Sequence, residues 1–167
     1  MNFLLALHQP HWQTVFTIPK ETVLQKGRRH GLYHDLTRAA QAIPEQFNCY
    51  TWGSETVVFY CGSFAHDYLR GGFKTNLQGR VHHYLQNHKR DARTGRANTN
   101  AMVFDNLSAA LTHSDILLRV LRFESLQVAD DTIDFATFST DPVLVHTVEA
   151  LLICLYRRQG QCEWNRA

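Results

Sequence analysis

The stretch NCYTWGSETVVFYCG, residues 48–62, carries a strong β-hairpin pattern. Two runs rich in Val, Phe and Tyr flank Gly53 and Ser54, and this pattern is typical of two antiparallel strands joined by a turn. It predicts strands over 48–52 and 56–64.

Two tyrosines of this hairpin, Tyr50 and Tyr60, stand ten positions apart. An even spacing around a short turn can leave both side chains on one face of the hairpin. A cross-strand aromatic pair of this kind usually serves packing, so the pair alone does not indicate a site.

Helical patterns follow the hairpin. After a polar loop with paired glycines over 65–76, Asn76 suits the N-cap of a helix with apolar residues on one side. Asp141 followed by Pro142 is typical of the start of a last helix, which we expect to reach Tyr156. The other expected elements are a strand over 12–18, a broken helix over 20–43, a helix over 100–112, a strand over 116–124 and an acidic loop over 129–134.

The order of these elements predicts an α+β fold in which helices flank a small β-sheet. With 167 residues, of which 44% are hydrophobic, the chain is long enough for one compact domain with a core of its own. We expect an N-terminal extension over 1–45 and a main domain over 46–167, packed together as one compact unit.

The cysteines indicate a reducing compartment. The four of them, Cys49, Cys61, Cys154 and Cys162, include no CxxC pair and no zinc-finger spacing. We expect them to be reduced and buried as small hydrophobic residues. The apolar start, residues 1–7, is too short for a signal peptide, and no apolar run could cross a membrane. We therefore expect a cytoplasmic protein with no membrane partner.

Charge is distributed unevenly, although the net charge is only +2. Residues 68–96 contain seven Lys and Arg residues against one acid, together with His82, His83 and His88, whereas residues 100–149 contain two basic residues against eight acids. The basic block indicates either an anionic partner or a solvated basic face, and charge alone leaves both open.

Glu149 lies in the most apolar stripe of the last predicted helix. Its neighbours at i−4, i+3 and i+4 are Val145, Leu152 and Ile153. A buried carboxylate needs compensation, and a hard cation with oxygen ligands would supply it. The alternative is that Glu149 sits at the edge of the stripe and reaches solvent or an arginine.

Arg80 and Tyr84 share a face of the helix after the hairpin, so a guanidinium and a phenol can point at one spot. In order along the chain, the tyrosine hairpin, this pair, Glu149 and Asn165 resemble the signature of the GIY-YIG nuclease superfamily. The GIY slot is NCY (48–50), the YIG slot is YCG (60–62), the helix run is KTNLQGRVHHY (74–84), and the ending is VEALLICLYRRQGQCEWN (148–165).

The chain departs from the family pattern at a few positions. Asn48 and Cys49 replace the Gly and Ile of the first motif, and Ser63 stands where a lysine often follows the second. The loop before Arg80 is longer than usual, as it is in the restriction endonucleases of the superfamily. Lys74, in this loop, is a candidate to take the place of the missing lysine.

The second motif has an alternative register. Tyr68 with Gly71 or Gly72 also matches it. We prefer Tyr60, because it keeps the ten-residue step from Tyr50 and lies in the stronger strand pattern.

The resemblance implies a metal-dependent DNA endonuclease. It implies Mg2+, or alternatively Mn2+, bound by Glu149, with Arg80 holding the scissile phosphate. Tyr50 is the implied general base, although the roles of Tyr50 and Tyr60 could be exchanged. The other implied site residues are Tyr84 and Asn165, with His83 and Lys74 as further candidates.

The implied partner is double-stranded DNA. The expected DNA-binding residues are Arg70, Lys74, Lys89, Arg90, Arg93 and Arg96. A stand-alone catalytic domain with a long loop and an N-terminal extension, for DNA contact or subunit pairing, favours a type II restriction endonuclease that acts as a homodimer or higher oligomer. The alternatives are a low-specificity repair, phage or mobile-element nuclease and an inactive nucleic-acid-binding module.

Overall fold

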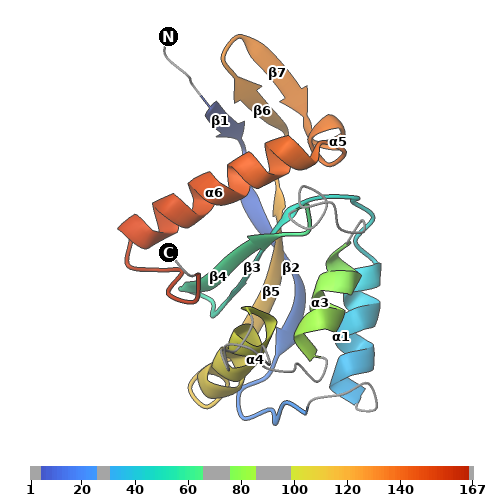
Figure 1. Ribbon diagram of the computed structural model, residues 1–167, viewed down its shortest axis with the longest axis vertical. Helices are drawn as coiled ribbons and strands as arrows, with labels where there is room; N and C mark the ends of the chain where they lie inside the picture. The colour runs from blue at the N-terminus through green and yellow to red at the C-terminus, as the bar shows by residue number, and fades with distance from the viewer. Residues whose placement is uncertain (1–4, 26–30, 66–75, 86–98, 166–167) are drawn as a thin grey trace, which may run out of the picture.

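The computed structural model describes residues 5–25, 31–65, 76–85 and 99–165. Within these ranges the chain forms two antiparallel sheets and five helices, which confirms the predicted α+β fold. In Figure 1 the long helix α6 (Pro142–Arg158) crosses the molecule between the smaller sheet above and the larger sheet below.

The larger sheet has the strand order β2-β5-β3-β4. Its strands are β2 (His11–Ile18), β5 (Ile116–Arg122), β3 (Cys49–Gly53) and β4 (Val58–Ser63). They are rich in β-branched and aromatic residues, which pack well on a pleated surface. All four predicted strands are therefore confirmed, with small shifts at their ends. β4 is an edge strand of this sheet, and the candidate site is built around it.

The turn of the hairpin needs its glycine. Ser54 N–H donates to the carbonyl of Val57 at 2.9 Å, so the turn spans 54–57 and is longer than Gly53-Ser54 alone. A Cβ atom on Gly53 would come within 2.3 Å of that same carbonyl oxygen. No side chain fits there without a change in the backbone.

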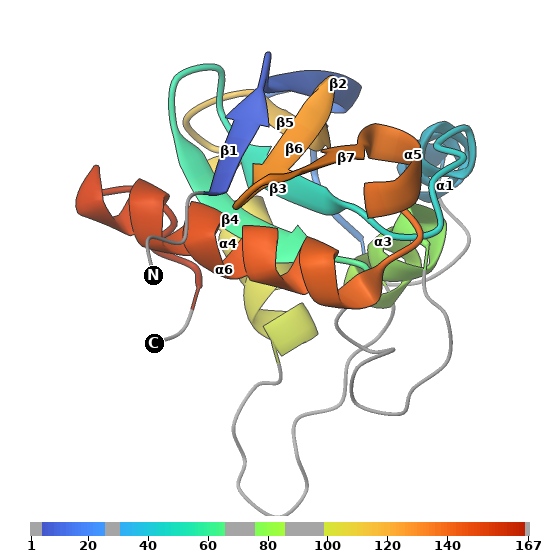
Figure 2. The same cartoon turned by 90° about the horizontal axis from the view of Figure 1, so that it is seen from above.

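Three helices cover one face of the larger sheet: α1 (Gly31–Gln41), α3 (Leu77–Leu85) and α4 (Thr99–Ala110). Figures 1 and 2 show α1 and α3 side by side, with α4 beside another part of the sheet. Oδ1 of Asn76 accepts the N–H of Gly79 at 2.9 Å, which confirms the predicted N-cap. The core under these helices includes Leu36, Trp52, Val81, Leu107, Leu118 and Val120.

The helix predicted over 20–43 is confirmed only in its second half. Residues 19–25 contain no helix. Glu21 adopts the left-handed conformation, with φ of 66°, and its N–H donates to the carbonyl of Leu111 at 2.7 Å. That conformation interrupts a right-handed helix. Residues 26–30 lie outside the described ranges.

Helix α6 covers the opposite face, where it packs against β3 and β4. Oδ1 of Asp141 accepts the N–H groups of Val143 and Leu144, which confirms the predicted start of this helix. The short helix α5 (Phe135–Phe138) precedes it. Neither α6 nor any other helix in the described ranges is long and apolar enough to cross a membrane.

The smaller sheet was not expected from the sequence. It consists of β1 (Leu5–His8), β6 (Ser125–Val128) and β7 (Asp131–Asp134) in the order β1-β6-β7. The prediction of an acidic loop over 129–134 is therefore wrong. Acidic residues are rare in strands, but β7 is a largely exposed edge strand, so its carboxylates stay in water.

The N-terminal extension is built into both sheets. β1 pairs with β6, and β2 pairs with β5 along most of its length. From α1, Tyr33 and Leu36 are buried in the main core. These residues therefore complete the sheets and the core of the main domain.

Three of the cysteines are buried as predicted: Cys49, Cys61 and Cys162. Cys154 is exposed on α6, so the burial prediction is wrong for it. It lies on the side of the helix that faces away from the sheet.

Candidate active site

Three phenol rings meet on the face of the hairpin that packs against α3. Tyr50 pairs with Gly62, and Tyr60 stands opposite Trp52, so the two hairpin tyrosines share a face as predicted. Their ring centroids are 6.1 Å apart. The ring of Tyr84 lies 6.4 Å from that of Tyr50 and 6.3 Å from that of Tyr60, and its hydroxyl is hydrogen-bonded to that of Tyr50. We call Tyr50, Tyr60 and Tyr84 the tyrosine cluster.

Gly62 makes room for this cluster. A Cβ atom at that position would lie 2.8 Å from the hydroxyl oxygen of Tyr50 and 2.8 Å from Cε1 of Tyr60. Real Cβ atoms do not approach other heavy atoms so closely, so only glycine lets both rings lie against β4. The glycine of the YIG slot therefore has a steric role in this chain.

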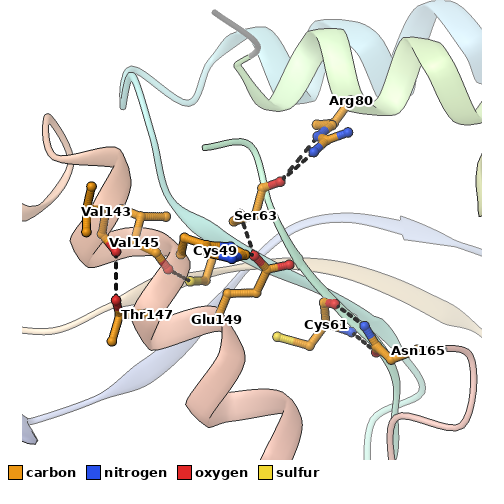
Figure 3. Close-up of polar contacts among 10 residues, drawn as sticks. Cys49, Cys61, Ser63, Arg80, Val143, Val145, Thr147, Glu149 and Asn165 are labelled. Carbon is orange, nitrogen blue, oxygen red and sulfur yellow. Dashed lines mark hydrogen bonds and ion pairs between the residues drawn. The ribbon is translucent and has the colours of Figure 1, made fainter. Parts of the chain in front are cut away.

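Glu149 approaches β4 from the opposite face of the sheet. Its residue is 8% exposed, and Oε2 accepts a hydrogen bond from Oγ of Ser63 at 2.7 Å (Figure 3). The Ser63 side chain points to this face because it follows Gly62 by one residue. Nδ1 of His146, one helical turn earlier, lies 3.0 Å from the same oxygen. The alternative of a Glu149 that reaches solvent from the edge of its stripe is therefore wrong.

Ser63 connects Arg80 to Glu149. Nε and Nη2 of Arg80 donate to the Ser63 carbonyl oxygen at 3.2 and 3.0 Å, while the hydroxyl of the same residue donates to Glu149 (Figure 3). These three hydrogen bonds to one residue hold the guanidinium and the carboxylate at the same point of β4. The sheet edge thus brings together a helix residue from each of its faces.

The C-terminal tail closes the free edge of β4. Oδ1 of Asn165 accepts the N–H of Cys61 at 2.9 Å, and Nδ2 donates to the carbonyl of Cys61 at 2.6 Å (Figure 3). The N–H of Cys162 donates to the carbonyl of Val58 at 2.7 Å. Asn165 therefore acts like a residue of an additional strand and holds β4 in place.

Burial is the largest influence on the pKa values of the tyrosine cluster. It raises the pKa of Tyr50 and of Tyr60 well above the ordinary value, and it raises the pKa of Tyr84 as well. The positive charge of Arg80 acts in the opposite direction on all three, and the charge of Glu149 adds to the rise at Tyr60 and Tyr84. The phenols are therefore neutral near pH 7, and a phenolate would need further positive charge nearby.

The members of the cluster differ in exposure. Tyr50 is 1% exposed and Tyr84 is 2% exposed, whereas Tyr60 is partly exposed. A bound molecule would therefore meet Tyr60 first. This favours Tyr60 over Tyr50, the expected general base, for contact with a substrate.

His83 lies on α3 beside the cluster but is half-buried on another side of the helix. Its ring centroid is 6.1 Å from that of His82, whose Nδ1 is hydrogen-bonded to the hydroxyl of Tyr33. Within the described residues, no polar contact joins His83 to the tyrosine cluster. His83 is therefore separate from the site. The other described candidates lie around β4: Tyr50, Tyr60, Arg80, Tyr84, Glu149 and Asn165.

Several expected residues lie outside the described ranges. They are Lys74 and all the other expected DNA-binding residues, Arg70, Lys89, Arg90, Arg93 and Arg96, together with the alternative motif of Tyr68, Gly71 and Gly72.

Two residues of the site were missed by the motif comparison. The family pattern gives Ser63 only as the residue in place of a lysine, and it assigns no role to His146. The signal for His146 was its position three residues before Glu149, which puts both side chains on one helix face. The signal for Ser63 was its place directly after Gly62, on the strand face opposite the tyrosines.

The donor atoms at Glu149 fit a hard divalent cation. The Ser63 hydroxyl donates to Oε2 and Nδ1 of His146 lies near the same oxygen, so Oε1 accepts no hydrogen bond from the described residues. Mg2+ commonly uses one or two carboxylates and keeps several water ligands. A single buried carboxylate is therefore sufficient, and the described residues contain no group of three or more His, Cys, Asp or Glu side chains that could hold a metal ion.

Comparison of the chain with protein-family models, with curated proteins and with solved structures finds no match.

Proposed function

We propose that this chain is a metal-dependent DNA endonuclease of the GIY-YIG type, which hydrolyses phosphodiester bonds. The observation that supports this most strongly is the arrangement around β4: Glu149 on the Ser63 hydroxyl, Arg80 on the Ser63 carbonyl, and the tyrosine cluster against Gly62. Apolar residues would serve packing better than a buried carboxylate and a guanidinium. Such a combination of charged groups and phenols is typical of a functional site.

Arg80 would bind the scissile phosphate. Its guanidinium is hydrogen-bonded to the Ser63 carbonyl, so its position is fixed before any substrate arrives. A guanidinium complements the charge that develops on the phosphoryl oxygens in the transition state. One well-placed donor of this kind is worth about 2.7–4 kcal/mol in other enzymes.

Tyr60 would accept the proton of the attacking water once it is ionised to the phenolate, which requires the added positive charge of a bound cation near the site. It is the partly exposed phenol of the cluster, and the charge of Arg80 lowers its pKa against the effect of burial. The water oxygen then bonds to phosphorus, the bond to the leaving oxygen breaks, and the leaving alkoxide takes a proton from solvent. Tyr50 and Tyr84, which are buried beneath Tyr60, would orient its side chain.

Glu149 would bind Mg2+ or Mn2+, with Ser63 orienting the carboxylate. A bound divalent ion neutralises charge on the phosphate and on the leaving oxygen. Glu149 itself holds its carboxylate at the edge of β4, on the side of Ser63 opposite Arg80. The phosphate would lie between these two residues.

The substrate would be double-stranded DNA, and the finer proposal is a type II restriction endonuclease. The basic residues of the long loop and of the segment after α3 would contact the DNA backbone, which makes affinity fall steeply with salt. An enzyme with one active site per chain usually cuts both strands of DNA as a dimer, so we expect a homodimer or a higher oligomer.

The test is a digest of supercoiled plasmid DNA with and without Mg2+ or Mn2+. We expect cleavage that requires the cation, and discrete bands whose sequenced ends share one site. A smear of fragments would support an endonuclease but refute the proposal of a site-specific restriction enzyme. A plasmid that stays supercoiled with either cation, while a gel shift shows binding, would instead indicate the inactive DNA-binding module.

A further inference from the structure

His146 stands beside the proposed cation ligand. It lies one helical turn before Glu149 on α6, and its Nδ1 is 3.0 Å from Oε2 of the carboxylate. The side chain of His146 is 40% exposed, whereas that of Glu149 is 11% exposed. The imidazole therefore lies closer to solvent than the carboxylate, where an ion entering the site would meet it.

The separation of the two atoms suits two ligands of one ion when the ring proton of His146 is on Nε2 and Nδ1 offers its lone pair to the ion. An octahedral ion with bonds of about 2.0–2.1 Å places neighbouring ligand atoms about 3.0 Å apart. A carboxylate and an imidazole three residues apart on a helix are also a recurrent way to present two ligands to one metal. His146 and Glu149 have both properties, the spacing along the helix and the distance between donor atoms.

We propose that His146 is a second protein ligand of the divalent cation held by Glu149, and that the site therefore prefers Mn2+ and Co2+ to Mg2+. The inference rests on the proposed role of Glu149 as a cation ligand. Carboxylate and water ligands suit Mg2+, whereas an imidazole nitrogen favours transition metals, with affinity rising from Mn2+ to Co2+. A site with one carboxylate and one imidazole should follow this order.

The experiment compares cation binding by the wild type, His146→Ala, His146→Asn and Glu149→Gln. His146→Asn keeps a hydrogen-bond donor near the position of Nδ1 but offers a poor ligand for transition metals. His113→Ala is the control, because His113 is an exposed histidine in the turn after α4. Calorimetric titration with Mg2+, Mn2+ and Co2+ gives affinities, and electron spin echo modulation of bound Mn2+ detects a coordinated imidazole nitrogen.

We expect the wild type and His113→Ala to bind Mn2+ more tightly than Mg2+ and to show the nitrogen signal. Since even outer partners of metal ligands are worth about 10–100-fold in affinity, both His146 variants should lose at least about tenfold in Mn2+ affinity. They should also lose the nitrogen signal, while Mg2+ affinity changes by less than about threefold. Glu149→Gln should weaken the binding of all three ions.

Three outcomes would overturn the proposal. The first is wild-type Mn2+ affinity in both His146 variants. The second is a loss of Mn2+ affinity in His146→Ala but not in His146→Asn. His146 would then only position Glu149 by a hydrogen bond. The third is a nitrogen signal that survives in both. None of these depends on cleavage, so a protein that binds Mn2+ through His146 but cuts no DNA would refute the proposed function and keep this inference.

Discussion

Replacing Gly62 by alanine would place a methyl group where two tyrosine side chains already stand. The new Cβ would lie 2.8 Å from the hydroxyl oxygen of Tyr50, 2.9 Å from Cζ of the same ring and 2.8 Å from Cε1 of Tyr60. Ordinary contacts between carbon atoms are about 3.5–4.0 Å, so both rings must move by roughly 0.7 Å or more. Tyr50 is 1% exposed and cannot swing into solvent.

This displacement should affect stability and activity differently. Overpacking of a buried site costs about 1–3 kcal/mol, and each kcal/mol lowers Tm by about 2–4 °C in a chain of this size. A shift of about 1 Å in a reacting group can cost about a hundredfold in rate. Gly62→Ala should therefore leave most of the protein folded at room temperature while its cleavage rate falls by about a hundredfold.

The assay combines thermal unfolding with single-turnover cleavage of plasmid DNA well below Tm. Gly31→Ala is the matched control, because a Cβ on Gly31, the first residue of α1, meets no atom within 4 Å. The control should match the wild type in both measurements. A Gly62→Ala protein with unchanged Tm and unchanged cleavage would refute the steric role of Gly62.

Three further substitutions test the connections around β4. Arg80→Lys keeps the charge but loses the pair of hydrogen bonds to the Ser63 carbonyl. The cleavage rate should fall by about a hundredfold with little change in Tm. Unchanged turnover would exclude the guanidinium from the site. Ser63→Ala removes the hydroxyl that donates to the buried Glu149. The free energy of unfolding at pH 7, measured by denaturant titration, should fall by about 1.5–3 kcal/mol. An unchanged denaturation midpoint would contradict this hydrogen bond. Asn165→Ala removes both side-chain hydrogen bonds to Cys61. Hydrogen exchange of the Cys61 amide should therefore accelerate, and the cleavage rate should fall more than DNA affinity. Exchange of this amide at the wild-type rate would show that the tail does not hold β4.

Local patterns were sufficient to predict the elements that carry the site. The hairpin, the N-cap at Asn76 and the start of α6 at Asp141 all follow from short-range chemistry: turn residues, capping side chains and a proline in the first helical turn. The shared face of Tyr50 and Tyr60 follows from strand parity. Each of these depends only on residues close together in the chain.

The remaining features depend on contacts between distant residues. β7 reads as an acidic loop in isolation and becomes a strand because β6 offers it an edge to pair with. The apolar neighbours of Glu149 predicted that its carboxylate needs compensation, but the donor, Ser63, is 86 residues away. Asn165 was expected at the site, yet its pairing with the edge of β4 follows only once the sheet order places that edge on the outside.

In the proposed mechanism, Glu149 holds the cation that phosphodiester cleavage needs. The most direct test of this role is Mg2+-dependent cleavage of plasmid DNA by the wild type and by Glu149→Gln, which keeps the shape of the side chain and a partner for Ser63. DNA affinity is measured in parallel by fluorescence anisotropy. We predict that the variant loses cleavage by at least about a hundredfold and binds DNA as the wild type does. Cleavage by Glu149→Gln at the wild-type rate would rule out Glu149 as the ligand of the cation.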